Sequence, residues 1–466
     1  MTEPLLHHSS MPAGRRVLVL GLGDTGWAAV RWLMRQGYDV RVADTRVQPP
    51  HRQILEETYP GVAFLGGPWQ DGLFQATDWV VVSPGVALDD PLIHGWRTRG
   101  MPFLGDVEVA ARVLARHPRR PKILAVTGAN GKSTVVSLLG DLARAQGLRT
   151  TVAGNIGVPL LEVLMDSPWP EVLVLELSSF QLETLASLDP DSAVVLNVSE
   201  DHMDRYPDMA TYAAAKARIY QGCEHPVGNR EDALVKAMIS AETPTFGLDA
   251  PVNARDWGVV LQNGERWLVQ GNRRVLRRSE VPLWGEHNVA NVLAALAMGQ
   301  ALGWAEPAML NAIREFRGLP HRVEWVADVA GVRFFDDSKG TNVGATVAAL
   351  KGVDAPVVLI AGGDGKGQDF SPLRPAVATH ARAVVLIGRD GARIDEALEG
   401  LAVPRVFATD MQDAVERAFA LARPGESVLM SPACASFDMF HNYLHRADVF
   451  CTAVHALARH GEEKRR

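Results

Sequence analysis

The chain has 466 residues, of which 47% are hydrophobic and 22% are charged, and its formal net charge is −7. This composition excludes a disordered chain, and because no long basic stripe occurs, it disfavours nucleic acid as the main partner. Three widely separated cysteines, Cys223, Cys434 and Cys451, fit neither a disulfide framework nor a zinc site. No apolar run has the length of a signal peptide or a membrane span. We therefore expect a cytoplasmic protein of about three domains.

The first segment alternates short apolar runs with amphipathic stretches. "RRVLVLGLGDTG" is an apolar run that ends in Gly21, Gly23 and Gly26, "WAAVRWLMRQG" has helical spacing, and "YDVRVADTR" has the pattern of a strand ending at Asp44. Strands separated by helices predict a parallel sheet with helices on both faces. The glycines fit the G-x-G-x-x-G turn, with Asp44 at the distance of a ribose-binding acid. These residues predict a site for a nucleotide diphosphate and leave its identity open, NAD included.

A second segment follows the basic linker "RHPRRP". An apolar strand over 122–126 leads into "TGANGKST", and a helix is expected over 133–146. The usual phosphate-binding loop reads G-x-x-x-x-G-K-[ST], but here Val126 stands where its first glycine belongs. The loop is therefore shortened to G-x-x-G-K-S, starting at Gly128. Its backbone N–H groups can hold phosphates, and Lys132 can contact the outer ones.

Acidic side chains follow two further strands of this segment. Glu176 ends the apolar strand in "EVLVLELSSFQLE", and the next strand runs into "NVSEDHMDR", which contains Asp201 and His202. Because the carboxyl ends of parallel strands form the ligand crevice, these groups are candidate Mg²⁺ ligands. Lys216 lies in "YAAAKARIY", where residue type alone predicts a surface lysine. The later stretch "RDWGVVLQNGERWLVQGNRRVLRR" alternates like antiparallel strands.

The third segment places polar turns after several apolar runs. "DDSKGTN", "GGDGKG" and "SPACASFD" contain Asp337, Lys339, Thr341, Lys366 and Ser436. Lysine and hydroxyl groups that converge on one crevice suit a small carboxylated substrate. The sequence therefore predicts three α/β domains, with a nucleotide turn in the first, a phosphate loop in the second and a carboxylate site in the third.

Taken together, these motifs resemble the Mur ligases of peptidoglycan synthesis, and most nearly their D-glutamate-adding branch. The resemblance runs in order from about Val17 to Phe450, and its stretches are "GLGDTG", "ADTR", "SPG", "GANGKST", "GNIG", "ELSSFQLE", "NVSEDHMDRY", "AAKARIY", "EHNVAN", "GLPHR", "DDSKGTN", "GGDGKG" and "SPACASFD". It implies a Rossmann-like N-terminal domain over 1–118, a central P-loop-type ATP-binding domain over 119–317, and a Rossmann-like C-terminal domain over 318–466. The shortened loop resembles the form that this ligase superfamily uses.

The resemblance also implies a role for each matched residue. The catalytic residues are Lys132, Glu176, His202 and Lys216. ATP is expected at Gly128, Ala129, Asn130, Gly131, Lys132, Ser133, Thr134, Asn288, Arg322 and Asp337. The uridine nucleotide-sugar is expected at Thr25, Asp44, Thr45, Arg46, Gly85, Asn155 and His202. Glutamate is expected at Lys339, Thr341, Lys366, Ser436 and Tyr443. At the position of Tyr443 the family often has phenylalanine. One Mg²⁺ is expected at Ser133 and Glu176, and a second at His202 and Lys216, with Lys216 carbamylated.

The implied activity is an ATP-dependent amide ligase that adds D-glutamate to UDP-N-acetylmuramoyl-L-alanine. ATP turns a carboxylate into an acyl phosphate, and the amine of glutamate then displaces phosphate. We expect a monomer that acts on small molecules in cell-wall precursor synthesis and binds no nucleic acid. Three alternatives stay open: a sister ligase that adds L-glutamate or another amino acid, an NAD-dependent oxidoreductase, and a non-catalytic nucleotide-binding regulator.

Overall fold

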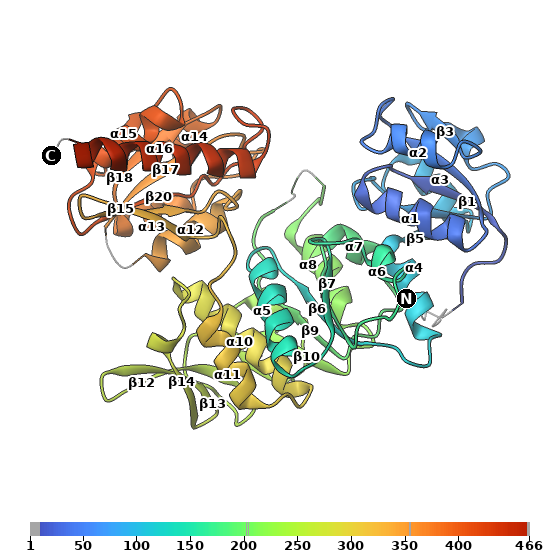
Figure 1. Cartoon of the computed structure of the whole chain (residues 1–466), viewed down its shortest axis with the longest axis horizontal. Helices are drawn as coiled ribbons and strands as arrows, with labels where there is room; N and C mark the ends of the chain where they lie inside the picture. The colour runs from blue at the N-terminus through green and yellow to red at the C-terminus, as the bar shows by residue number, and fades with distance from the viewer. Residues whose placement is uncertain (1–9, 202, 204, 354–355, 464–466) are drawn as a thin grey trace.

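The structure is a computed structural model that describes residues 10–201, 203, 205–353 and 356–463, with the backbone alone for residues 460–463. Three sheets follow one another along the chain, and the first and third lie on opposite sides of the second (Figure 1). We call the corresponding parts the first domain (β1 to α4), the central domain (β6 to α11) and the third domain (β15 to α16). The predicted α/β class with three domains is confirmed, whereas the boundaries at residues 118 and 317 stay predictions.

The first domain contains a five-stranded parallel sheet in the order β3-β2-β1-β4-β5. The inner strands β1 and β4 are almost entirely buried, which explains why the strand at the nucleotide turn is a continuous apolar run. Its elements are β1 (Arg16–Leu20), α1 (Asp24–Arg35), β2 (Asp39–Asp44), α2 (Arg52–Thr58), β3 (Ala63–Gly66), β4 (Trp79–Val82), α3 (Pro91–Thr98), β5 (Phe103–Gly105) and α4 (Asp106–Ala115).

The central domain contains a nine-stranded sheet in the order β14-β13-β12-β11-β10-β9-β6-β8-β7. The strands from β7 to β12 are parallel, and β12, β13 and β14 pair antiparallel, as their alternating sequence predicts. The strands are β6 (Lys122–Thr127), β7 (Thr150–Gly154), β8 (Val172–Glu176), β9 (Ser192–Val195), β10 (His225–Asn229), β11 (Thr245–Phe246), β12 (Trp257–Gln262), β13 (Glu265–Gln270) and β14 (Arg273–Arg277). The α-helices are α5 (Lys132–Ala145), α6 (Leu160–Val163), α7 (Ser179–Glu183), α8 (Met209–Ala217), α9 (Ala233–Lys236), α10 (Glu286–Ala301) and α11 (Glu306–Glu315).

The third domain contains a six-stranded sheet in the order β15-β16-β20-β17-β18-β19, in which β15 alone pairs antiparallel among the described strands. Its strands are β15 (Glu324–Val329), β16 (Val332–Asp336), β17 (Val357–Gly362), β18 (Ala381–Ile387), β19 (Arg405–Phe407) and β20 (Ser427–Met430). Its helices are α12 (Val343–Gly352), α13 (Leu373–His380), α14 (Gly391–Ala397), α15 (Met411–Leu421) and α16 (Tyr443–Glu463).

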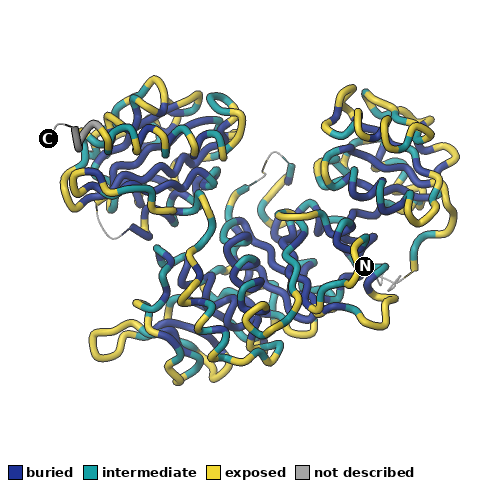
Figure 2. The backbone as a smooth tube through the Cα atoms, in the orientation of Figure 1, coloured by how far each residue is buried: buried dark blue, intermediate teal, exposed yellow. Residues whose placement is uncertain are grey.

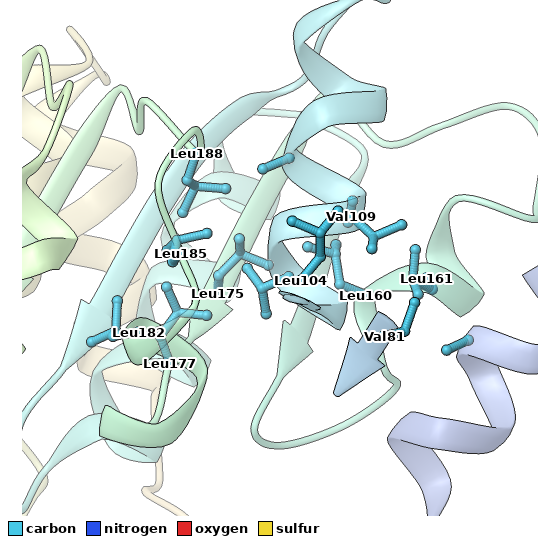
Figure 3. Packing of buried hydrophobic residues seen from close by; sticks show 14 of the residues in the cluster. Val81, Leu104, Val109, Leu160, Leu161, Leu175, Leu177, Leu182, Leu185 and Leu188 are labelled. Carbon is cyan, nitrogen blue, oxygen red and sulfur yellow. The ribbon is translucent and has the colours of Figure 1, made fainter. Parts of the chain in front are cut away.

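The hydrophobic cores divide the molecule unequally. Figure 2 shows buried strands inside each lobe and exposed residues mostly in the connections. One cluster of buried residues joins the first and central domains, because it includes Val81, Leu104 and Val109 together with Leu160 and Leu161 (Figure 3). The two clusters of the third domain take all their fully buried members from residues 323–454. The first two domains therefore share a core that the third does not join.

The helices were compared with the length and apolar character of a membrane-spanning segment. Within the described part of the chain, none of them combines the length and the apolar character that a membrane-crossing helix needs.

Candidate functional site

The shortened loop joins β6 to α5, as the sequence predicts. Gly131 has φ 85°, and a Cβ atom there would lie 2.5 Å from Oδ1 of Asn291, so both backbone conformation and space require glycine. Asn197, just after the neighbouring strand β9, anchors the loop through hydrogen bonds. Its side-chain oxygen accepts from the N–H of Asn130 at 2.8 Å, and its carbonyl accepts from Ala129 at 3.0 Å. Helix α5 begins at Lys132, so its N-terminal N–H groups face an anion-binding position.

Lys132 folds back over this loop. Its Nζ donates to the carbonyl oxygens of Gly128 at 2.7 Å and Ala129 at 2.9 Å. Burial lowers the pKa of Lys132, while the carboxylates of Glu176 and Asp201 act in the opposite direction. The cation thus sits at the helix N-terminus, held by neutral carbonyls that a phosphate can displace.

Glu176 lies at the carboxyl end of β8, beside the loop. Its side chain is buried, and Oε1 accepts a hydrogen bond of 2.8 Å from the amide of Asn155. Its other oxygen, Oε2, is buried and has no hydrogen-bond partner among the described residues. Because a buried carboxylate oxygen is costly to leave unpaired, this atom is suited to a hard cation such as Mg²⁺.

Lys216, on α8, is buried rather than exposed, so the prediction from residue type alone was wrong. Its Nζ donates to the carbonyl of Gly128 at 3.0 Å and lies 4.5 Å from the ring centroid of Tyr212. Burial lowers the pKa of Lys216 well below its usual value, and the nearby charge of Lys132 lowers it further, while Asp201 opposes the shift. The local sequence of the helix predicts exposure, but Lys216 is buried because α8 turns this side chain toward the phosphate loop. His202, the remaining predicted catalytic residue, lies outside the described residues.

Hydrogen bonds from Asn342 in the third domain and from Arg322 just before it reach the phosphate loop and the start of α5. Arg322 donates from Nη2 to Oγ of Ser133 at 2.9 Å. The amide of Asn342 donates to Oδ1 of Asn130 at 3.3 Å. The hydroxyl of Ser133, which is an expected Mg²⁺ ligand, therefore already accepts a hydrogen bond from Arg322.

A cavity of about 360 Å³ opens beside the loop, between the central and third domains. Six residues that the sequence assigns to ATP line it: Asn130, Gly131, Thr134, Asn288, Arg322 and Asp337. Burial raises the pKa of Asp337 to about 7, against a hydrogen bond of 2.6 Å from Ser431. The structure thus collects residues separated by some two hundred positions around one space of nucleotide size.

A larger cavity, of about 1090 Å³, lies between the first and central domains. It is lined by all the described residues that the sequence assigns to the uridine nucleotide, namely Thr25, Asp44, Thr45, Arg46, Gly85 and Asn155. The carboxylate of Asp44 accepts from the N–H of Leu22 at 2.8 Å and from the guanidinium of Arg46 at 2.7 Å. Asp44 therefore holds the glycine turn. A Cβ at Gly26 would lie 1.9 Å from the carbonyl oxygen of Gly21, which explains why the last position of the G-x-G-x-x-G turn must be glycine.

The three polar turns of the third domain lie together. The turn that carries Lys366 pairs with the turn before Ser436, through hydrogen bonds in both directions between Asp364 and Ala435. Nζ of Lys339 lies 3.9 Å from the ring centroid of Tyr443. Burial lowers the pKa of Lys339, and the charges of Arg322, Lys132 and Lys366 add to this effect against Glu176. Thr341 follows on the same turn, and its N–H donates to the carbonyl of Lys339. Ser436 is buried, whereas Lys366 is exposed with φ 49°.

Sequence patterns did not single out Arg446, which joins two of these turns. Its fully buried guanidinium donates to the carbonyl of Ser338 at 2.8 Å and to that of Cys434 at 3.1 Å. Ser338 adjoins Lys339 in the sequence, and Cys434 lies two positions before Ser436. An arginine inside a long amphipathic helix carries no local signal of such a role, because the acceptors are more than a hundred and about a dozen residues away.

Comparison with known proteins covers almost the whole chain. Residues 15–105 match the Mur ligase MurD-like N-terminal domain, residues 126–299 match the Mur ligase middle domain, and residues 321–434 match the Mur ligase glutamate ligase domain. A relative from Methylobacillus flagellatus, named UDP-N-acetylmuramoylalanine–D-glutamate ligase, is 52% identical over 94% of this chain and 96% of its own. A relative of the same name from Thiobacillus denitrificans is 51% identical over 96% of this chain and 97% of its own.

Solved structures share the fold at low sequence identity. A UDP-N-acetylmuramate-alanine ligase from Thermotoga maritima has a TM-score of 0.58 at 19% identity, covering 95% of this chain and 99% of its own. The E. coli protein FolC, solved with DHPP and ADP, has a TM-score of 0.55 at 17% identity, covering 75% and 93%. These likenesses concern the three-domain fold alone.

Proposed function

This chain belongs to the Mur ligase family, and from that membership we propose that it joins D-glutamate to UDP-N-acetylmuramoyl-L-alanine with hydrolysis of ATP to ADP and phosphate. Relatives of about half-identical sequence, matched over nearly their full length, are named for this reaction. The observation that carries the proposal is the meeting of Lys132, Glu176 and Lys216 at one shortened loop, between a large cavity and the polar turns of the third domain.

The reaction follows from the chemistry of these groups. The carboxylate of the alanyl group attacks the γ-phosphorus of ATP, which gives an acyl phosphate and ADP. The amine of glutamate then attacks the acyl carbon, phosphate leaves with the bonding electrons, and the amine loses a proton. Phosphoryl transfer needs positioning and neutralisation of charge more than covalent help from the protein. We assign the neutralisation of charge on the outer phosphates to Lys132, whose Nζ donates to two carbonyl oxygens in the structure.

The cavities suggest where each substrate binds. We place the uridine nucleotide in the larger cavity, with Thr25, Asp44, Thr45, Arg46, Gly85, Asn155 and His202 around it, and ATP at the smaller cavity and the loop from Gly128 to Thr134. Glutamate then falls to Lys339, Thr341, Lys366, Ser436 and Tyr443. We propose that the chain acts as a monomer in the cytoplasm, where ATP and nucleotide sugars are available. A dinucleotide oxidoreductase would leave the buried lysines beside the loop without a role.

The donor set at the loop fits Mg²⁺. The unpaired Oε2 of Glu176 and the hydroxyl of Ser133 are oxygen ligands for one ion, and His202 with a modified Lys216 would hold a second. Bound there, Mg²⁺ would neutralise charge on the phosphates of ATP. An unmodified ammonium would repel the ion, so the second position requires a change at Lys216.

We propose that Lys216 becomes a carbamate in the active enzyme. Its neutral amine adds CO₂, forms an N–C bond and releases a proton, which gives an anion with two oxygens. Burial favours this reaction because it lowers the pKa of Lys216 and so increases the fraction of neutral amine. The free amine already points at the phosphate loop, through its hydrogen bond to Gly128.

Phosphate release tests the proposed function. Purified full-length protein would be incubated with ATP, Mg²⁺, UDP-N-acetylmuramoyl-L-alanine and one of a panel of D- and L-amino acids, and the product would be identified by mass. We expect phosphate and an amide product with D-glutamate, and neither when the nucleotide sugar is omitted. A product with L-glutamate or another amino acid instead would identify a sister ligase. Binding of NAD(H) without phosphate release would overturn the proposal.

A further inference from the structure

Arg205 reaches from the central domain to the wall of the larger cavity. It lies in the connection between β9 and α8, and its Nη2 donates to the carbonyl oxygen of Val86, in the first domain, at 2.8 Å. The two residues are 119 positions apart in the sequence. Arg205 does not itself line the larger cavity.

The acceptor of this hydrogen bond belongs to a tight turn, Ser83–Val86, all four residues of which line the larger cavity. The N–H of Val86 donates to the carbonyl of Ser83 at 3.0 Å, which closes the turn. On one side, the hydroxyl of Ser83 donates to the carbonyl of Gly21 at 3.2 Å and so attaches this turn to the G-x-G-x-x-G turn. Arg205 holds the same turn from the side of the central domain.

The guanidinium of Arg205 is itself fixed in place. It lies 4.6 Å from the ring centroid of Phe180 and 3.9 Å from the carboxylate of Glu183, both on α7, and its side chain is 17% exposed. The hydroxyl of Tyr206 donates to the same carboxylate at 2.6 Å. The space between Arg205 and the turn is about 10 Å³, roughly enough for one water molecule. The turn therefore rests against a packed, charged support rather than against solvent.

We propose that Arg205 is a positioning residue that fixes the Ser83–Val86 wall of the larger cavity from across the domain boundary, and so sets the affinity for the uridine nucleotide. The inference rests on the proposed function, because it takes the larger cavity as the nucleotide site. A guanidinium is suited to this role because it holds a carbonyl acceptor and an aromatic face at the same time, which an ammonium does less well.

The test compares Arg205→Met, Arg205→Lys and a matched control in the full-length protein. Arg205→Met keeps much of the apolar stem and removes the donor, while Arg205→Lys keeps the charge. The control is Arg374→Met, since Arg374 also donates to backbone carbonyls, those of Ala397 and Glu399, but within the third domain. Calorimetry would measure the Kd of uridine diphosphate, and steady-state assays would give KM for each of the three substrates.

We expect Arg205→Met to raise the Kd of uridine diphosphate and the KM of the nucleotide sugar roughly tenfold, as loss of a hydrogen bond from a charged donor implies. Its KM for ATP and glutamate should stay within about twofold of wild type, and Arg205→Lys should recover part of the affinity. Arg374→Met should change neither. An unchanged Kd in Arg205→Met, or an equal rise in all three KM values with a lower Tm, would overturn the inference. If wild type itself bound ATP but no uridine diphosphate, the proposed function would fail instead.

Discussion

The junction between the first and central domains is a shared apolar core beside the larger cavity, whereas the junction between the central and third domains includes polar contacts beside the smaller cavity. At the first junction, Val81 and Leu104 pack in one cluster with Leu160 and Leu161 (Figure 3). At the second, the contacts include Arg322 with Ser133 and Asn342 with Asn130. Arg322, Ser133 and Asn130 are expected ATP-site residues, and Asn342 adjoins Thr341, which is expected to hold glutamate. Trp284 adds one partly buried ring against the core of the third domain.

This difference separates binding from chemistry. Apolar burial stabilises a junction whether or not a ligand is present, so the nucleotide cavity of the first junction is formed in advance. Polar contacts at a partly solvated junction contribute little net free energy, because water and ligands offer equivalent partners. The second junction can therefore exchange its contacts when ATP and glutamate arrive, and its closure would exclude water from an acyl phosphate.

The largest effect is expected at Lys132, which lies on the chemical side of this division. Lys132→Ala removes a cation preorganised for the transferring phosphoryl group, at a cost of at least roughly 2.7–4 kcal/mol in the transition state, or about a hundredfold in turnover. The Kd of uridine diphosphate should stay within about twofold of the wild-type value, since the larger cavity, where we place the uridine nucleotide, lies at the other junction. Phosphate release and calorimetry measure the two quantities. Retention of more than about a tenth of wild-type turnover would contradict the assigned role.

Lys216 distinguishes a structural lysine from a modified one at the same loop. Lys216→Ala should be nearly inactive, and an added small carboxylate such as acetate should restore part of the activity by supplying the lost oxygens. Lys216→Arg should stay inactive, because arginine keeps its positive charge. Rates with and without acetate, together with ¹³C NMR after addition of labelled CO₂, provide the measurement. Full activity of the arginine variant would rule out a carbamate.

Leu161 tests whether the first junction is one core. Leu161 is fully buried on α6, so Leu161→Ala should cost roughly 2–5 kcal/mol of unfolding free energy. Because the first two domains share this cluster, calorimetry should show one lowered transition for both, and an unchanged transition for the third domain. Leu429→Ala, in the core of the third domain, is the matched control and should lower the other transition alone. Equal shifts of all transitions in both variants would remove the distinction between the junctions.

Asp337 should make the unfolding free energy of the third domain depend on pH, and this is the smallest of the expected effects. Burial raises the pKa of its carboxyl from 3.8 to about 7, so the folded state binds the proton more strongly than the unfolded state. Its contribution to stability is present below the unfolded pKa and is lost as pH rises through about 7. Asp337→Asn should therefore stabilise the third domain by on the order of 1–4 kcal/mol at pH 8, and by much less at pH 4. Thermal unfolding across this range would show a constant difference if the carboxyl were not buried.

Local sequence was sufficient for the parts of the site that lie at strand ends. The loop at Gly128, Glu176 at the end of β8, and the turns at Lys339 and Ser436 each lie at the end of an apolar run, and parallel sheets bring such ends to one edge. The antiparallel strands of the central sheet were also predictable, because their alternation has period two.

Contacts between distant segments could not be predicted in this way. The burial of Lys216 depends on what α8 packs against, and the ties made by Arg205 and Arg446 join residues about a hundred positions apart. The shared core is equally hidden, since Leu161 resembles any leucine of a short helix until α6 meets α1 and α4. Pairing across domains is a property of the tertiary structure, and residue type at one position does not encode it.

Hydrogen exchange tests the contrast between the two junctions most directly. Full-length protein would be compared free and with Mg²⁺ and a non-hydrolysable ATP analogue, with peptides followed by mass spectrometry. We predict increased protection around Arg322 and Asn342, and unchanged protection along α4 and α6, where the shared core lies. Protection that changes along α4 and α6 while residues 317–345 stay as they were would contradict a preformed first junction and an exchangeable second one.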